Sequence, residues 1–337
     1  MKMEIRRVQL TGGSSYVITL PKEWIKSVNI KKNDPLGLLI QSDGTLLITS
    51  KMTEEQTRRI KEFDVNDKTN QTFLLRQLVG AYISGYTSIK IKSSKRIPPA
   101  ARTTIRKFTQ TTIGQEVIEE TDTSITLKDL VNPTEMPFNS TIKRMYIIVK
   151  GMHEDTMRAL ATSNKTLAED VLSRDNDVDR LHWLVARQHN IILQNVSLAE
   201  KMKITIEMSS TYFLISRIIE RIGDHAVRIS QNIINLVDSK VDQRIIDLIQ
   251  SASNLALDIF NKSIGAFFRR DLHTANRNIE SVKKLEILCK EISTLALQEK
   301  GVTAISIGYI VESIRRVGEY AEDISEAVIN YIMGETA

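Results

Sequence analysis

The sequence contains a single cysteine, Cys289, among 337 residues. One cysteine cannot form a disulfide within the chain and excludes a zinc site built from several thiolates. We therefore expect Cys289 to be a small buried hydrophobic side chain in a reducing compartment. Proline is also scarce, with six in the chain and none after Pro137. Because aromatic residues make up only 5%, the core must consist mainly of Ile, Leu, Val and Ala.

Long hydrophobic runs are missing as well. Leu36–Ile40 and Met145–Val149 are among the longest, and both fall far short of the ~20 apolar residues that a membrane-spanning helix needs. The N-terminal residues lack the apolar stretch of a signal peptide. We expect no membrane insertion and a cytoplasmic protein.

Charge is distributed unevenly along the chain. Residues 1–130 carry a formal charge of +7 and residues 131–337 a charge of −2. A basic N-terminal region followed by a near-neutral remainder is typical of proteins that bind nucleic acid. A solvated basic surface without a nucleic-acid partner would give the same charge distribution. A chain of this length predicts two or three domains, and changes in periodicity divide it into residues 1–50, 51–133 and 134–337.

The first two segments contain β-structure. In residues 1–50, short β-rich runs separated by Gly, Asp and Pro turns predict strands near 4–10, 15–20, 36–40 and 45–49, with a helix at 22–28. So small a unit buries too little surface to be stable alone, so we expect it to dimerise. Residues 51–133 predict a small basic α/β domain, with helices near 70–84 and 100–112 and strands near 88–92, 116–120 and 124–127.

Residues 134–337 predict an all-helical domain, because from Phe138 to Ile332 apolar residues recur at helical spacing and no proline appears. The expected helices are 138–162, 165–195, 203–237, 241–269, 271–299 and 303–333. Two of them share a pattern at a constant offset of 95 residues, from Gly223 to Asn235 and from Gly318 to Asn330. This indicates an internal duplication of three helices, with repeats of about 138–237 and 241–333. The small residues on the shared face allow close helix packing.

Paired carboxylates stand at helical spacing in the first repeat. Asp175 and Asp179 are four residues apart on one expected helix, and Glu220 and Asp224 on the next. Residues four apart lie on the same helix face, so two adjacent helices would gather four anions. Such an all-oxygen set suits hard cations. Each pair alone could equally be a solvated helix face.

The carboxylate motif and the residues around it, Glu220-Arg-Ile-Gly-Asp224-His225-Ala226, resemble the PhoU family of phosphate-transport regulators over residues 138–333. The resemblance implies two three-helix bundles whose surface carboxylates hold iron or zinc, and the donor set also suits magnesium or manganese. The metal ligands implied are Asp175, Asp179, Glu220 and Asp224, with Asp177 and His225 as weaker candidates.

The second repeat departs from this pattern. Arg315 and Glu319 stand at the positions of Glu220 and Asp224, and Ile279 and Lys283 stand at those of the other pair. We therefore expect the second metal site to be lost.

The N-terminal segment, with Arg6-Arg7-Val8, Gly13-Ser14-Ser15 and Thr19-Leu-Pro-Lys22-Glu-Trp24, resembles the AbrB/MazE/SpoVT family over residues 3–50. The resemblance implies a swapped-hairpin β-barrel dimer that binds DNA or acts as an antitoxin. Arginines and a Gly-Ser loop on one surface can contact phosphates and base edges. The DNA-binding residues implied are Arg6, Arg7, Ser14, Ser15 and Lys22.

These observations predict a multidomain α+β protein: a swapped-hairpin dimer module, a small α/β middle domain and a six-helix PhoU-like domain. The combination resembles archaeal regulators of phosphate. We expect a homodimeric, DNA-binding transcriptional regulator of phosphate uptake with a metal-binding sensor domain. The alternative is a signalling adaptor that acts on a phosphate transporter ATPase or a sensor kinase, with the β-module only dimerising. An enzyme is not expected, because no phosphate loop, nucleophile triad or H-E-x-x-H motif is present.

Overall fold

A computed structural model describes residues 4–40, 44–50, 59–132 and 135–334. The chain divides into two compact units, Met1–Thr57 and Arg58–Ala337. The boundaries predicted from the sequence near residues 51 and 133 adjoin or fall on residues outside the described ranges, so they stay predictions. The small sheet and the helical bundles both belong to the second unit.

The first unit contains two separate β-hairpins and one short helix. Its elements are β1 (Gln9–Thr11), β2 (Ser15–Val17), α1 (Lys22–Ser27), β3 (Gly37–Ile40) and β4 (Leu46–Thr49). β1 pairs antiparallel with β2, and β3 with β4. The expected order of strands and helix is therefore confirmed, although β1 begins at Gln9 rather than near residue 4. Both glycines of the first turn, Gly12 and Gly13, have φ values of 62° and 83°, which L side chains rarely adopt.

The described residues of this first unit form no buried core within one copy of the chain. Across the described residues 4–50, every side chain whose burial is given is exposed or only partly buried. Ile5, Tyr16 and Ile40 expose 85%, 79% and 80% of their surface. Apolar surface of this extent in so small a unit points to an association partner.

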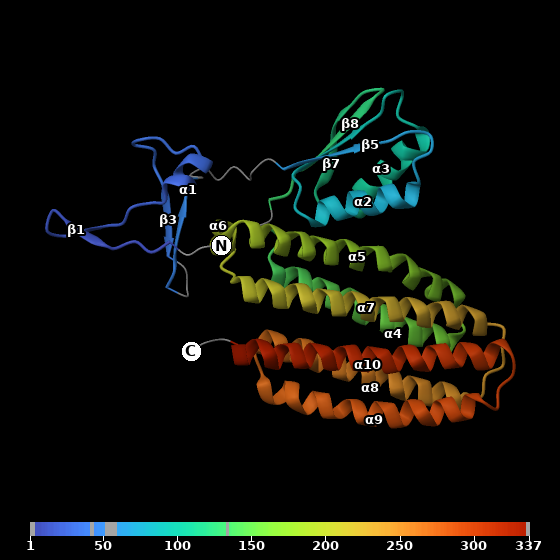
Figure 1. Ribbon diagram of the computed structural model, residues 1–337. Coiled ribbons are helices and arrows are strands. Elements are labelled where there is room, and N and C mark those ends of the chain that lie inside the picture. The colour runs from blue at the N-terminus through green and yellow to red at the C-terminus, as the bar shows by residue number, and fades with distance from the viewer. Residues whose placement is uncertain (1–3, 41–43, 51–58, 133–134, 335–337) are drawn as a thin grey trace. The chain divides into compact units, whose positions relative to one another are not determined.

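The second unit begins with a four-stranded sheet covered by two helices, labelled in Figure 1 as α2 and α3. The strands lie in the order β5-β6-β8-β7, with β5 parallel to β6 and the other pairs antiparallel. Leu74 and Leu78 of one helix and Phe108 of the other are buried with the apolar face of the sheet. β5 is an edge strand that the sequence analysis missed. The elements are β5 (Ile60–Asp64), α2 (Gln71–Ile83), β6 (Ser88–Lys92), α3 (Pro99–Thr111), β7 (Gln115–Glu120) and β8 (Ser124–Asp129).

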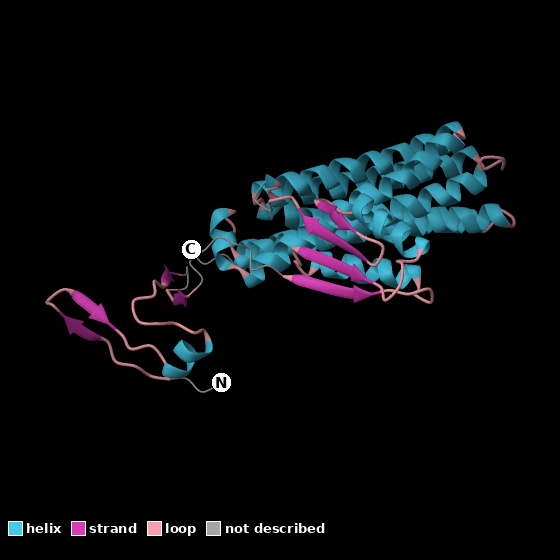
Figure 2. Ribbon diagram, turned by 90° about the horizontal axis from the view of Figure 1, so that it is seen from above, coloured by secondary structure: helices cyan, strands magenta, loops and turns pink. Residues whose placement is uncertain are grey.

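Long helices form the rest of the second unit, and they lie alongside one another in Figures 1 and 2. All six expected helices are present, and the short α6 was not predicted. Asn164, Thr205 and Asp271 cap three helix N-termini, because their side chains accept hydrogen bonds from backbone N–H groups of the first turn, as these residue types favour. The helices are α4 (Phe138–Thr162), α5 (Lys165–Gln194), α6 (Val196–Lys201), α7 (Ile206–Leu236), α8 (Gln243–Arg269), α9 (Leu272–Ala296) and α10 (Val302–Gly334).

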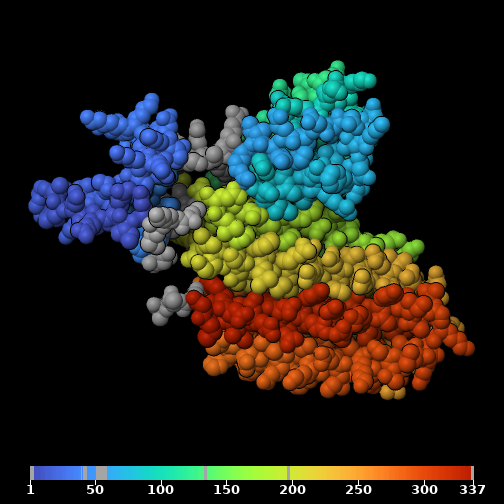
Figure 3. Space-filling view, viewed as in Figure 1, coloured from blue at the N-terminus to red at the C-terminus, as the bar shows by residue number. Residues whose placement is uncertain are grey.

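The helices form two three-helix bundles. Helices α4, α5 and α7 contact one another, as do α8, α9 and α10, and the bundles meet mainly along α7 and α10. Figure 3 shows α7 and α10 in direct contact. Equivalent glycines pack inside each bundle: a Cβ on Gly223 would lie 3.4 Å from Val149, and one on Gly318 only 2.2 Å from Leu285. The small residues at these positions therefore permit close helix packing, as the sequence indicated.

Candidate functional site

Four carboxylates lie on adjoining helices of the first bundle. Asp175 and Asp179 are on α5, Glu220 and Asp224 are on α7, and these helices pack against each other. Spacing of four residues places each pair on one helix face. The four residues that the sequence analysis selected as metal ligands therefore lie on two neighbouring helices, near enough for the charges of the other three to act on Asp179.

The carboxylates disfavour one another's ionisation. Burial and the charges of Asp175 and Glu220 raise the pKa of Asp179 to about 7. Burial and the charge of Asp224 raise the pKa of both Asp175 and Glu220. Burial also raises the pKa of Asp224, with Arg217 opposing the shift. Like charges held in partly desolvated positions favour either a bound proton or a nearby cation.

The donor chemistry fits a hard cation, and the side-chain arrangement fits less well. Oε2 of Glu220 is buried and has no hydrogen-bond partner among the described residues. Its other oxygen lies 3.8 Å from Arg217 Nη1, too far for a hydrogen bond. However, no group of three or more His, Cys, Asp or Glu side chains in the described ranges is arranged to hold a metal ion. A shared ion would therefore require these carboxylates to rotate toward one another.

The two weaker candidates have other contacts. Asp177 lies 3.9 Å from Arg180 in an exposed ion pair. His225 stacks at a tilt on Tyr320 of α10, with ring centroids 5.6 Å apart. Burial, with the charge of Arg228, lowers the pKa of His225 to about 4. His225 is therefore a neutral ring at the junction of the two bundles.

The residues implied in DNA binding all lie on the surface of the first unit. Arg6 and Arg7 precede β1, Ser14 lies in the turn after it, and Ser15 begins β2. Lys22 begins α1. Arg6 forms an ion pair of 2.9 Å with Glu4. All five side chains are exposed, so the structure leaves each of them accessible to a ligand.

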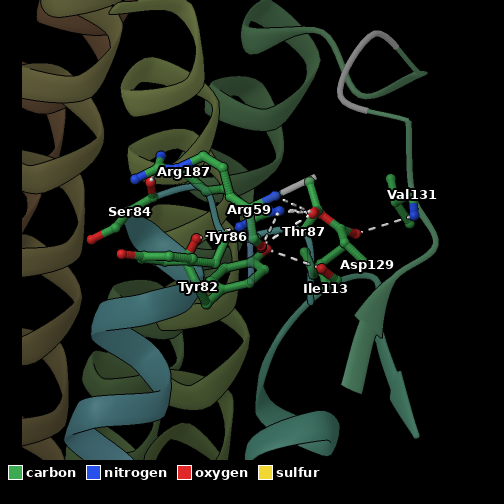
Figure 4. Close-up of polar contacts among 9 residues, drawn as sticks. All are labelled: Arg59, Tyr82, Ser84, Tyr86, Thr87, Ile113, Asp129, Val131 and Arg187. Carbon is green, nitrogen blue, oxygen red and sulfur yellow. Dashed lines mark hydrogen bonds and ion pairs between the residues drawn. The ribbon is translucent and has the colours of Figure 1, made fainter. Parts of the chain in front are cut away.

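A buried ion pair that the sequence analysis missed joins the sheet domain to the helical domain. Arg187 of α5 exposes only 2% of its side chain and Asp129 of β8 only 8%. Arg187 Nε donates to Asp129 Oδ2 at 2.9 Å, and Nη2 donates to the carbonyl oxygen of Tyr86 at 3.0 Å. The guanidinium also lies 4.8 Å from the ring centroid of Tyr82 and donates to the carbonyl oxygen of that residue. Figure 4 shows these residues and their hydrogen bonds.

Further side chains complete this interface at the C-terminal end of α2. Asn190 Nδ2 donates to the carbonyl oxygen of Ile83 at 3.1 Å. Arg59 Nη1 donates to the carbonyl oxygen of Ser84 at 2.7 Å and contacts Gln194. The last carbonyl groups of a helix lack hydrogen-bond partners within the helix. At the end of α2, Asn190 of α5 and Arg59 supply the missing donors. No motif in the sequence marks these long-range contacts.

None of the helices described is long and apolar enough to cross a membrane. Fold and site together define a multidomain α+β protein with a duplicated helical bundle and an acidic surface cluster. The sequence profile of the PhoU domain matches residues 142–233 and 249–328, once in each bundle. The chain belongs to the PhoU family. The profile of the MazE family, described as antidote-toxin recognition MazE, bacterial antitoxin, matches residues 9–56.

Relatives and solved structures match the helical bundles. The phosphate-specific transport system accessory protein PhoU homolog 1 of Thermotoga maritima is 24% identical over 197 residues, covering 56% of this chain and 83% of the relative. A PhoU homolog of Zymomonas mobilis is 25% identical over 180 residues, covering 51% and 74%. The crystal structure of PhoU from Pseudomonas aeruginosa matches with a TM-score of 0.50 and 20% identity, covering 59% of this chain and 96% of that chain. The relatives are named as accessory proteins, which agrees with the expectation that this chain is not an enzyme.

Proposed function

We propose that this protein is a dimeric, DNA-binding transcriptional regulator of phosphate uptake whose PhoU bundles act as the sensor. The observation that carries the proposal is the union of a MazE-like segment and a duplicated PhoU domain in one chain. The relatives of the PhoU part are named as accessory proteins of phosphate-specific transport. A DNA-binding segment attached to such a domain would act on transcription in the cytoplasm.

The exposed apolar side chains of the first unit support dimerisation through it. The strands β1 to β4 bury no described side chain completely, and exposed Tyr16, Leu38 and Ile40 supply apolar surface for a second copy. Interleaved hairpins of two chains would form the barrel that one chain lacks. Such a dimer would double the number of arginines at 6 and 7 on the DNA-facing surface.

DNA binding would use phosphate contacts from the arginines and base contacts from the Gly-Ser turn. Arg6, Arg7 and Lys22 carry fixed positive charge on exposed backbone segments, and Ser14 and Ser15 offer hydroxyls that can reach phosphates or base edges. Binding by such groups should weaken steeply as salt rises.

The second unit adds positive charge on α3. Arg106 and Lys107 are exposed there, while two other basic residues, Arg96 and Arg102, pair with Asp122 and Glu120. Arg106 and Lys107 are therefore the better candidates for additional phosphate contacts.

The acidic cluster would hold a hard cation in the first bundle. Asp175, Asp179, Glu220 and Asp224 are the proposed ligands, and iron, zinc, magnesium or manganese would supply the positive charge that these carboxylates lack. The support is the donor set, the mutual rise of the pKa values and the buried unpartnered oxygen of Glu220. The cation would tie α5 to α7 and so link its occupancy to the packing of the bundle.

The test is binding of the purified full-length protein to the promoter of a phosphate-transporter operon and to its own upstream DNA, titrated with salt. We expect sequence-specific binding that Arg6→Ala/Arg7→Ala weakens at least tenfold. Lys201→Ala/Lys203→Ala, which removes two exposed lysines of the helical domain, serves as the matched control and should bind normally. Specific binding that survives the loss of both arginines would contradict the proposed surface.

A second candidate is a signalling adaptor that acts on a phosphate transporter ATPase or a sensor kinase. The observation that favours it is the name of the relatives, which are accessory proteins of a transport system and match only part of this chain. In that case the first unit would serve only for dimerisation. Absence of specific DNA binding by an intact dimer, together with co-purification of a transporter subunit, would decide for the adaptor.

A further inference from the structure

A cavity of about 270 Å³ lies where α4 and α7 begin, beside the turn that joins α6 to α7. This volume is close to the lower end of the range of roughly 300–1,000 Å³ that small-molecule pockets occupy. None of the proposed metal ligands or DNA-binding residues lines it. Its apolar wall consists of Phe138 at the start of α4, Met202 and Ile204 of the turn, and Met208 and Tyr212 of α7.

Two aromatic rings form the buried part of this wall. Phe138 and Tyr212 are each only 3% exposed, and their ring centroids lie 5.3 Å apart. Tyr212 also packs edge-on against Phe267 of α8, with centroids 5.1 Å apart. Because α8 belongs to the second bundle, a group that binds against Tyr212 would contact a side chain that joins the two bundles.

Polar groups stand beside the aromatic rings. The hydroxyl of Tyr212 donates to Oδ1 of Asn139, and burial raises the pKa of Tyr212 to about 12, so the hydroxyl stays protonated and neutral. The bond fixes Asn139 through its acceptor atom. Its Nδ2 group therefore remains a donor that a ligand at the cavity can use.

The charged side chains of the cavity are all positive. Lys201 and Lys203 line it, and no carboxylate does. Lys203 is exposed and forms no ion pair with another described residue. The N-terminus of α4 has no side-chain cap, so its partial positive charge adds to that of the lysines. A ligand with a negatively charged group would therefore meet cations and no anion in this lining.

The backbone at Lys203 allows its charge to be tested cleanly. Lys203 has a φ of 52°, in the left-handed region. Its N–H donates to the carbonyl oxygen of Glu200, and the N–H of Ile204 donates to that of Ala199, both at 3.0 Å. This pair of bonds ends a helix and favours glycine at the position that Lys203 occupies. Replacement by glycine therefore removes the amine without straining the turn.

We propose that this cavity binds a small organic phosphate, with its apolar body against Phe138 and Tyr212 and its phosphate group between Lys201 and Lys203. A phosphate monoester carries a charge of about −1.5 to −2 at neutral pH, which matches two lysines better than a carboxylate does. The apolar wall accounts for the body, because inorganic phosphate alone would leave it exposed to water. Binding here is independent of the DNA contacts and of the carboxylate cluster, whose residues lie outside the lining.

The test uses naphthyl phosphate as the probe, in equilibrium dialysis against the purified full-length protein. Fluorescence measures the unbound probe. We expect saturable binding of one molecule per chain. Naphthol has the apolar body without the charge, and inorganic phosphate has the charge without the body, so each should bind at least tenfold more weakly. Naphthol or inorganic phosphate binding as tightly as the ester would overturn the proposed ligand class.

Variants locate the probe on the protein. Lys203→Gly should weaken binding at least fivefold while the melting temperature stays the same or rises. Met208→Trp should weaken it at least tenfold by filling the cavity, and Lys203→Gly decides if this variant does not fold. Lys284→Ala, at an exposed lysine of α9, is the matched control and should bind within twofold of the unsubstituted protein.

The outcomes separate this site from the proposed function. Lys201→Ala/Lys203→Ala, the control of the DNA titration, should lose the probe and keep its DNA binding. Unchanged probe binding by Lys203→Gly, or no saturable binding by the unsubstituted protein, would overturn the assignment of this cavity. Either result would leave the DNA-binding test unaffected.

Discussion

Replacing Arg187 by methionine should detach the sheet domain from the helical bundles. The substitution removes the partner of Asp129, whose side chain is 8% exposed, and the donors to the carbonyl oxygens of Tyr82 and Tyr86. Removing one member of a buried ion pair costs about 3–5 kcal/mol, because the other charge stays buried without a partner. For a unit of this size, a loss of about 3–5 kcal/mol in the free energy of unfolding corresponds to a fall of about 10 °C in its melting temperature.

The assay is thermal unfolding of the full-length protein combined with hydrogen exchange. Exchange should accelerate in α2, β6 and β8, and the bundle helices should change little if the domains separate before they unfold. Arg187→Met/Asp129→Asn should recover part of the loss, because it removes the unpaired charge. Arg76→Met, at an exposed position of α2, is the matched control and should stay within about 0.5 kcal/mol. A destabilisation below about 1 kcal/mol for Arg187→Met would refute the structural role given to this pair.

Three further outcomes are expected. Gly318→Ala should destabilise the second bundle by about 1–3 kcal/mol, because the added Cβ would lie 2.2 Å from Leu285 and overpacking a core is costly. Gly308→Ala on the same helix is the control: an added Cβ would meet nothing within 4 Å, so this variant should be stabilised by up to about 1 kcal/mol. Denaturant unfolding of the two variants measures the difference. In EDTA, the contribution of Asp179 to stability should fall as pH rises from about 4 to about 7, because the folded-state pKa of Asp179 is raised from 3.8 to about 7 and the folded form binds more protons in that range. The measurement is the difference between the unsubstituted protein and Asp179→Asn in melts recorded across pH, because the buried histidines, whose pKa values are lowered, shift stability in the opposite direction in both proteins. If Arg6 neutralises one DNA phosphate, Arg6→Ala should reduce the slope of log affinity against log salt by about 0.9, measured in the same DNA titration for both proteins.

The helical half could be predicted closely from the sequence for identifiable reasons. No proline follows Pro137, apolar residues recur at helical spacing, and residues such as Asn164 and Asp271 mark helix starts. Periodicity of this kind depends only on local sequence. The constant offset between the motifs at Gly223 and Gly318 was enough to detect the duplication, and the PhoU profile matches once in each copy.

Other features could not be predicted because they depend on distant contacts. The strand β5, Ile-Lys-Glu-Phe-Asp, carries three charged residues among its five, which is not a strand pattern. It is fixed by pairing with β6, 28 residues later. Arg187 and Asp129 are 58 residues apart in sequence, and neither has a local signal for burial. Spacing placed Asp175 and Asp179 on one helix face, but only the packing of α5 on α7 shows that Glu220 and Asp224 lie near them.

The most direct test of the account is genome-wide occupancy of the protein in cells grown with abundant and with limiting phosphate, measured by cross-linking and immunoprecipitation of DNA. We predict enrichment at promoters of phosphate-transport genes, a change in that enrichment between the two phosphate levels, and its loss in Arg6→Ala/Arg7→Ala. Absence of DNA enrichment at both phosphate levels, with the protein cross-linked instead to a transporter subunit or a sensor kinase, would contradict the account.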